Sequence, residues 1–277
     1  DFNFEILIID SCSFDESIEN IPQDKRISIY QIPQKEFQHG RTRNLAISLA
    51  KGEFISFLTQ DAIPINNYWL KNIIAPFLDD KNICAVFGKH TSHSNHPEYI
   101  KKEIESHFNQ FNIKNNYKKE DNLRKYYSND VSYRQKLHYY SDNNSCLRKS
   151  EWFKFPYHDV DYGEDQLYAD WIIQINKTKA YASNALVSHS HDYSVEDEYY
   201  RSETEAYFFF KYFGYELSQN RLNTEKTIEN LAREFLNSDK KYYDTFDIEK
   251  KLNKIRAKLE GYNSGVEKFK NELLRTD

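Results

Sequence analysis

Residues 41–62 read RTRNLAISLAKGEFISFLTQDA, and this stretch contains a complete helix-to-strand unit. Apolar residues at helical spacing predict a helix over 41–50, which Gly52 ends. The apolar run 54–58 then predicts a buried strand, followed directly by Thr-Gln-Asp. Asp61 therefore stands at the carboxyl end of a strand, the position at which open α/β sheets bind their ligands.

The flanking segments repeat this alternation of strand and helix. Strands are predicted over 4–9, 27–32 and 83–87, and an amphipathic helix over 69–78, in which Pro76 is expected to cause a kink or an early end. Strands that alternate with helices of this length indicate βαβ units and a parallel sheet. The predicted fold class is therefore α/β: a mostly parallel sheet flanked by helices, with a helical C-terminal extension.

Beyond residue 90 the pattern is less regular. A polar region rich in Asn, Lys and Tyr precedes a further predicted strand at 185–188. After residue 195 every regular pattern is helical. We therefore predict an α/β domain over residues 1–195 and a helical region over 196–277.

The last predicted helix has a heptad pattern. Its apolar residues recur at spacings of four and three from Ile248 to Leu273. Gly261 and Gly265 interrupt this pattern, so we expect a kink or break there. The apolar stripe is suited either to interaction with a partner or to packing against the chain's own α/β domain.

The composition excludes several classes of protein. The 277 residues carry 38 Lys and Arg against 43 Asp and Glu, a net charge of −5, so no basic field favours nucleic acid. Three isolated cysteines fit no zinc motif and suit a reducing compartment. No apolar run reaches the ~20 residues that a membrane-spanning helix needs, and no signal peptide is visible. We expect a soluble cytoplasmic protein, free or peripheral at the inner face of the membrane. Because methionine is absent, we also expect the natural chain to begin upstream of Asp1.

Asp61 and two histidines are candidate metal ligands. A strand-end carboxylate is costly to desolvate unless it meets a cation, and a divalent ion bound to a diphosphate would supply one. The competing interpretation of Asp61 is a residue that caps the next turn. His189 and His191 stand two residues apart, so on a strand both would face one side and could bind a metal or a phosphate. Two surface histidines before a turn would produce the same pattern.

Three further sites combine charge with the end of a predicted element. Glu164 and Asp165 open a predicted helix, where acids are common because of the helix dipole; the functional alternative is a general base. Asp10 ends a strand and is suited to binding a nucleobase or ribose, or to stabilising the turn. The stretch 39–44 places two arginines at a helix start, which suits an anion bound to Arg43 or, equally, a solvated turn.

In chain order, these motifs resemble the large inverting family of GT-A glycosyltransferases. The motifs that carry the resemblance lie at 4–11, 37–44, 52–62, 163–166 and 189–194. Those at 37–44 and 52–62 are similar to the rhamnosyltransferase branch, in which the usual Asp-x-Asp signature appears as Thr-Gln-Asp. The family's first strand and helix have no counterpart here, and Thr59 replaces the first acid of the metal motif.

The resemblance implies a role for each motif. Asp165 would be the catalytic base that removes the proton of the acceptor hydroxyl. Binding of the donor would fall to residues at the strand ends and at the helix start: Asp10, Arg43, Gln60 and Asp61. Binding of a divalent ion, Mg²⁺ or Mn²⁺, would fall to Asp61, His189 and His191.

The reaction implied is inverting transfer of a sugar, L-rhamnose from dTDP-L-rhamnose in the first place, to a hydroxyl of a glycan or lipid-linked glycan acceptor in surface polysaccharide synthesis. One alternative is a UDP-hexose or UDP-N-acetylhexosamine transferase of the same fold. Another is a non-catalytic module that recruits partners through its C-terminal helices. Self-association or contact with a membrane surface through these helices is a further expectation.

Overall fold

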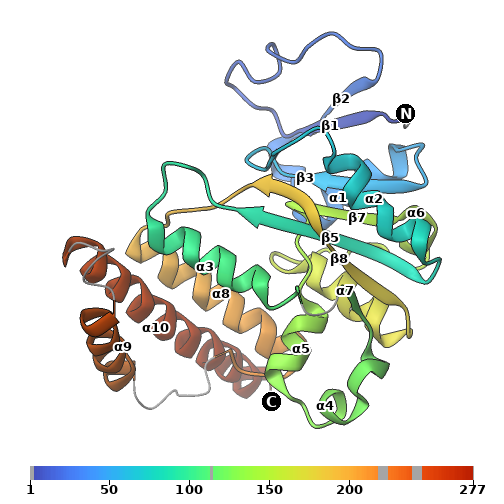
Figure 1. Ribbon diagram of the computed structural model, residues 1–277. Helices are drawn as coiled ribbons and strands as arrows, with labels where there is room; N and C mark the ends of the chain where they lie inside the picture. Colours follow the sequence, from blue (N-terminus) through green and yellow to red (C-terminus); the bar gives the residue numbers. More distant parts are fainter. Residues whose placement is uncertain (1–2, 113–114, 218–223, 239–244, 277) are drawn as a thin grey trace. The chain divides into compact units, whose positions relative to one another are not determined.

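The computed structural model describes residues 3–112, 115–217, 224–238 and 245–276 (Figure 1). The chain divides into two compact units. The first comprises Asp1–His93 and Ile104–His189, and the second comprises Ser94–Glu103 and Ser190–Asp277. The predicted boundary of the α/β domain after residue 195 lies near this division and remains a prediction.

The first unit is built on a mixed sheet in which the strands follow the order β3-β7-β5-β8-β4, with β6 paired to β8 (Figure 1). In chain order these strands are β3 Phe54–Leu58, β4 Ile63–Pro64, β5 Ile83–Thr91, β6 Asn116–Tyr117, β7 Asn144–Arg148 and β8 Thr178–Ser188. A separate parallel pair is formed by β1 Ile6–Asp10 and β2 Ile27–Gln31. The strand predicted over 54–58 is confirmed.

Helices cover both faces of the sheet. On one face, Ile73 and Phe77 pack in a cluster with Val86 of β5. Phe87 follows Val86 on the strand and therefore faces the opposite way, into a larger cluster that includes Tyr168. The helices of this unit are α1 His39–Leu49, α2 Trp69–Asp79, α4 Leu123–Tyr127, α5 Val131–His138, α6 Lys149–Trp152 and α7 Glu164–Gln174, with short 3-10 turns at Gln34–Glu36 and Lys119–Asn122. A further helix, α3 Glu98–Asn109, contains residues of both units.

The α/β class predicted from the sequence is confirmed, but the sheet is not mostly parallel. In the larger sheet β5 and β8 are parallel, whereas β7 is antiparallel to β3 and β5, and β4 and β6 are antiparallel to β8. The regular strand–helix alternation ends near residue 90, and the chain then enters β7 at the end where β5 finishes. Because strands such as β5 and β7 are buried on both faces in either direction, their apolar runs do not reveal strand direction.

Two strands are longer than predicted. β8 begins at Thr178 instead of residue 185, and β5 continues past Gly88, where its register with β8 shifts. A Cβ at Gly88 would lie 2.7 Å from Asn144 Cγ, so only glycine lets the Asn144 side chain approach β5 this closely. In α2, Pro76 lies inside the last turn and does not end the helix early.

The second unit is helical, with α8 Val195–Phe213, α9 Thr224–Ser238 and α10 Thr245–Thr276. The heptad stripe of α10 packs on α8, since the Phe269 ring contacts Tyr207 and Phe210 at centroid distances of 5.6 and 5.9 Å. Val266 of the same stripe is buried. Among the described helices of the chain, none is long and apolar enough to cross a membrane.

The expected break in α10 is absent, because the helix is continuous through both glycines. A Cβ at Gly265 would lie 2.8 Å from the backbone nitrogen of Tyr207, and one at Gly261 would lie 2.9 Å from Ser202 Cβ. The glycines therefore allow the backbones of α8 and α10 to pack closely. Their position inside a helix reflects tertiary contact and not a bend.

Candidate active site

Asp61 and His189 lie side by side in the first unit. Asp61 follows β3 and His189 follows β8. The short β4 pairs with the end of β8, with Ile63 opposite Ser188, and this pairing places Asp61 Oδ2 3.4 Å from His189 Nε2. His189 is buried, while 36% of the Asp61 side chain is exposed. A carboxylate–imidazole pair with one open side is suited to a divalent metal ion.

Two neighbouring side chains orient this pair. Thr59 Oγ1 donates a hydrogen bond to Asp61 Oδ1 at 2.5 Å, and the Asn143 amide nitrogen lies 3.1 Å from His189 Nε2. Thr59, which replaces an acid of the Asp-x-Asp signature, thus holds the remaining carboxylate in place. Gln60 is exposed in the same turn, and its predicted contact with the donor remains a prediction.

His191, the third predicted metal ligand, belongs to the second unit and is exposed. It follows His189 by two residues, and two residues of chain span at most about 7 Å between Cα atoms. The covalent chain therefore keeps His191 close to His189. Its participation in a metal site remains a prediction.

Asp165, the predicted catalytic base, lies in a cluster of carboxylates around Arg43. Arg43 Nε is 3.2 Å from Asp142 Oδ2, and the guanidinium also forms an ion pair with Glu164. The backbone N–H of Asp142 donates to Asp165 Oδ2 at 3.3 Å, and that of Gln166 donates to Oδ1 at 2.8 Å. Part of the Asp165 surface is open to solvent. Arg43 thus lies among carboxylates, and its predicted contact with a donor phosphate remains a prediction.

Two carboxyl groups of this cluster, those of Asp165 and Asp142, retain protons more strongly than isolated carboxylates do. Burial raises the pKa of Asp165 well above its ordinary value, and the charges of Glu164 and Asp142 raise it further, while Arg43 lowers it. Burial also raises the pKa of Asp142. For Arg43, burial lowers the pKa but the surrounding carboxylates outweigh this effect and raise it. A carboxylate with a raised pKa is a stronger base once ionised, which suits proton removal near neutral pH.

The loop between α5 and β7 connects the two groups. Its Asp142 contacts Arg43 and Asp165, and the next residue, Asn143, contacts His189. Ser145 Oγ fixes the loop by donating to Asp142 Oδ1 at 2.5 Å. We did not predict a role for Asp142 or Asn143 from the sequence. The only local signal was a polar run directly before a buried strand, which is typical of many surface turns.

The stretch predicted to receive an anion, residues 39–44, packs against the loop that precedes α7. Asn44 Oδ1 accepts hydrogen bonds from Trp152 Nε1 at 2.7 Å and from the Tyr157 backbone at 2.9 Å, while its Nδ2 donates to the Tyr157 carbonyl at 2.8 Å. Arg41 forms an ion pair with Asp159 at 2.6 Å. These contacts fix the chain segment that leads into the helix of Asp165.

Asp10 ends β1 and stabilises the turn that follows. Its carboxylate accepts hydrogen bonds from Ser13 Oγ at 2.5 Å, from the Ser13 backbone at 3.2 Å and from Gln31 Nε2 at 3.2 Å. The Ser13 hydroxyl is the main reason why the pKa of Asp10 is lowered. The carboxylate is thus ionised and oriented, and its predicted contact with a nucleobase remains a prediction.

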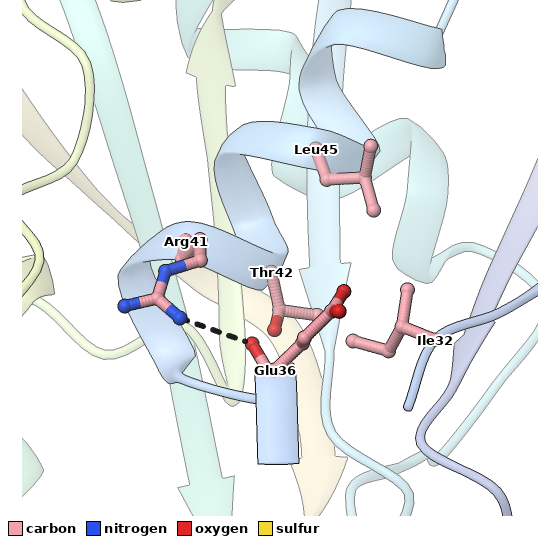
Figure 2. A pocket seen from close by; sticks show the side chains of 5 residues that line it. All are labelled: Ile32, Glu36, Arg41, Thr42 and Leu45. Atoms are coloured by element: carbon pink, nitrogen blue, oxygen red, sulfur yellow. Dashed lines mark hydrogen bonds between the residues drawn. The ribbon is translucent and has the colours of Figure 1, made fainter. Parts of the chain in front are cut away.

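Figure 2 shows a small pocket at the first turn of α1, with a volume of about 60 Å³. It is lined by Ile32, Glu36, Arg41, Thr42 and Leu45. The Ile32 backbone donates to the Asp10 carbonyl at 2.8 Å, so the pocket begins where β1 and β2 end. Pockets that enclose drug-sized ligands measure about 300–1,000 Å³. This one is therefore too small to enclose a nucleotide.

Comparisons with known proteins agree with these observations. The family model for Glycosyl transferase family 2 matches residues 1–150. O-antigen chain rhamnosyltransferase RfbN of Salmonella typhimurium is 32% identical over 203 residues, and WbaN of Salmonella anatum, with the same description, is 33% identical over 202 residues. Each match covers 71% of this chain and 60% of the relative. The chain thus spans about 60% of the length of these curated relatives.

One solved structure with a similar fold is the mannosyltransferase PcManGT from Pyrobaculum calidifontis, in complex with GDP-Man and Mn²⁺. Its TM-score is 0.57 at 11% sequence identity, and the match covers 94% of this chain and 77% of that protein. At this identity the likeness concerns the fold alone. It supports the GT-A-type architecture that the sequence motifs predicted.

Proposed function

The chain belongs to glycosyl transferase family 2, and on this premise we propose that it transfers a sugar from a nucleoside diphosphate to a hydroxyl group of a glycan, with inversion at the anomeric carbon. One observation carries the proposal. The consecutive residues Asp142 and Asn143 connect Asp165, a suitable base, to the Asp61–His189 pair, a suitable cation site. A base that accepts the proton of the attacking hydroxyl and a cation that stabilises the departing diphosphate both assist such a displacement.

In the proposed mechanism, Asp165 accepts the proton of the acceptor hydroxyl as that oxygen attacks the anomeric carbon. Its two backbone hydrogen bonds orient the carboxylate, and the residue is partly exposed. Burial and the charges of Glu164, Asp142 and Arg43 together determine the proton affinity of Asp165. The transfer itself is assigned to residues 1–195.

The side chains present fit a divalent cation. Asp61 supplies a carboxylate oxygen and His189 an imidazole nitrogen, and we propose His191 as a second imidazole. Mg²⁺ strongly prefers oxygen ligands, whereas Mn²⁺ lies between Mg²⁺ and the metals that favour imidazole, so this donor set suits Mn²⁺ better. When bound, the ion would neutralise charge on the departing diphosphate. The remaining donor contacts are assigned to Asp10, Gln60 and Arg43.

We propose dTDP-L-rhamnose as the donor and a glycan or lipid-linked glycan as the acceptor. The names of the two curated relatives support this choice, because both are described as O-antigen chain rhamnosyltransferases. The metal motif reads Thr-Gln-Asp, as in the rhamnosyltransferase branch, and Thr59 is hydrogen-bonded to Asp61.

A donor panel tests the proposal. The protein is titrated by calorimetry, with Mn²⁺, against dTDP-L-rhamnose, UDP-hexoses, UDP-N-acetylhexosamines and GDP-mannose, and transfer to a synthetic acceptor is followed by NMR. We expect dTDP-L-rhamnose to bind selectively, to bind more weakly to Asp61→Ala, and to yield a product of inverted anomeric configuration. Selective binding of a UDP-sugar would show that the donor is that sugar and not dTDP-L-rhamnose. Absence of binding to every nucleotide sugar would favour a non-catalytic module.

A further inference from the structure

Lys179 lies near the start of β8 and is fully buried. Burial lowers the pKa of its ammonium group well below the ordinary value. The rings of Phe87 and Tyr117 face this group, with their centroids 5.2 and 5.8 Å from Nζ. Because burying an ammonium group is costly unless hydrogen bonds compensate for the lost water, such a lysine depends on acceptors at well-defined positions.

These acceptors are the backbone carbonyls that end α5. Lys179 Nζ donates hydrogen bonds to the carbonyls of Lys136 at 3.0 Å, of Leu137 at 2.6 Å and of Tyr139. The last carbonyls of a helix have no partner within the helix and carry the negative end of its dipole, so a buried ammonium group is well matched to them. Three bonds from one nitrogen also restrict where these carbonyls can lie. Lys179 therefore fixes the backbone at the point where the chain leaves α5.

The residue between these acceptors joins the same turn to α7. His138 is fully buried, and its Nε2 lies 3.1 Å from Asp170 Oδ1. Asp170 belongs to α7, the helix whose first turn contains Asp165. The last turn of α5 is thus held to β8 by Lys179 and to the helix of the proposed base by His138.

The loop that follows α5 supplies a hydrogen bond to this base. Asp142 comes three residues after Tyr139, and its backbone N–H donates to Asp165 Oδ2 at 3.3 Å. Three residues of chain span at most about 10 Å, so the position of Tyr139 limits where this N–H can lie. A bond of 3.3 Å is already long, and a small displacement of the loop would break it.

We propose that Lys179 is a positioning residue for sugar transfer: by binding the last carbonyls of α5, it places the Asp142 N–H against the carboxylate of Asp165. The inference rests on the proposed function, in which Asp165 is the catalytic base. Every residue on this path belongs to the first unit. Lys179 acts through the backbone of residues 139–142.

The test compares the wild type with Lys179→Met, which removes the three donors at nearly the same side-chain length. Aspartate side chains are labelled with ¹³C for NMR, and the Asp165 resonance is identified by its absence from Asp165→Asn. Burial raises the pKa of Asp165 and the Asp142 N–H lowers it, so loss of this bond should raise the pKa further. The Asp142 N–H should also exchange with solvent about 5-fold faster.

With donor and acceptor present, kcat of Lys179→Met should fall about 10-fold while KM for the donor stays the same. A displaced base weakens stabilisation of the transition state and leaves donor binding intact. Lys179→Gln keeps two N–H donors on a shorter side chain and provides a milder variant should Lys179→Met unfold. Smaller changes in the same directions are expected for it, and wild-type values in all three measurements would refute the proposal.

Lys149→Met is the matched control. Lys149 Nζ donates to the carbonyl of Ala50, which follows the last turn of α1, so the same kind of bond is removed at the end of another helix. The pKa of Asp165 and the exchange of the Asp142 N–H should equal those of the wild type. If Lys179→Met does not differ from this control, Lys179 does not position the loop. A higher pKa without faster exchange would also overturn the proposal, because it would indicate a lost charge instead of a lost hydrogen bond.

The two NMR measurements need no turnover, so this inference and the proposed function can fail separately. If Asp165→Asn abolishes transfer while Lys179→Met matches the control, only the positioning role is refuted. If Asp165→Asn keeps full transfer activity, the assignment of the base fails, and the role of Lys179 in transfer fails with it.

Discussion

Replacing Asp165 with Asn tests the assignment of the base through two independent quantities. A positioned general base contributes about 10²- to 10⁴-fold to the rate, so kcat should fall by that factor, which corresponds to about 3 to 5 kcal/mol. The variant keeps the size of the side chain. It offers one acceptor oxygen to the two backbone donors of Asp142 and Gln166, which costs about 1 kcal/mol of folding free energy.

The substitution should also change how the free energy of unfolding depends on pH. Because the pKa of Asp165 lies above its ordinary 3.8 in the folded protein, the folded state binds more protons than the unfolded chain between the two values. The free energy of unfolding of the wild type therefore falls as pH rises through this window, by at most about 1.4 kcal/mol per pH unit for one proton. The asparagine side chain of the variant does not titrate and binds no such proton. The variant should thus be no more stable than the wild type near pH 4 and gain relative stability toward pH 8.

Calorimetric unfolding of both proteins at four pH values from 4 to 8, with kcat at saturating donor, measures both effects. Asp161→Asn, the same change at an exposed residue just before α7, is the control and should leave kcat and the pH profile unchanged. The wild-type kcat/KM should rise with pH as Asp165 loses its proton, and this rise should lie above the pH range in which ordinary carboxylates titrate. A stability difference that does not vary with pH, or a variant with wild-type kcat, would refute the reasoning.

Three other substitutions test the surrounding structure. Asn44→Leu removes three hydrogen bonds, one with Trp152 Nε1 and two with the Tyr157 backbone, each of which contributes about 1 kcal/mol. Urea unfolding should therefore show a free energy of unfolding lower by about 3 kcal/mol, and a decrease of less than about 1 kcal/mol would contradict the contribution assigned to these bonds. Asp61→Asn should weaken Mn²⁺ binding in calorimetric titrations, and Mn²⁺ should support faster wild-type turnover than Mg²⁺; equal turnover with both ions would argue against imidazole ligands. Gly265→Ala should lower the free energy of unfolding by about 1–3 kcal/mol, because its Cβ would meet the backbone of α8. In an isolated helix the same change stabilises by about 1 kcal/mol, so a more stable variant would show that α8 and α10 are not in close contact.

The sequence alone determined the fold class and the elements around the metal motif. The helix before Gly52, the strand 54–58 and Asp61 at its end were all predicted, since apolar periodicity reports which residues a local element buries. The chain order of the motifs also indicated the family. The direction of β7 was beyond such reasoning, because a strand buried on both faces has the same apolar pattern in either direction.

The tertiary structure decided which side chains meet. Asp142 and Asn143 look like ordinary turn residues, yet their loop contacts both Asp165 and His189, which are far away in the chain. Glycines in α10 predicted a break, and their actual use is close packing on α8. Sequence periodicity reports burial along one element, whereas a site depends on contacts between elements, and these are set only when the whole chain packs.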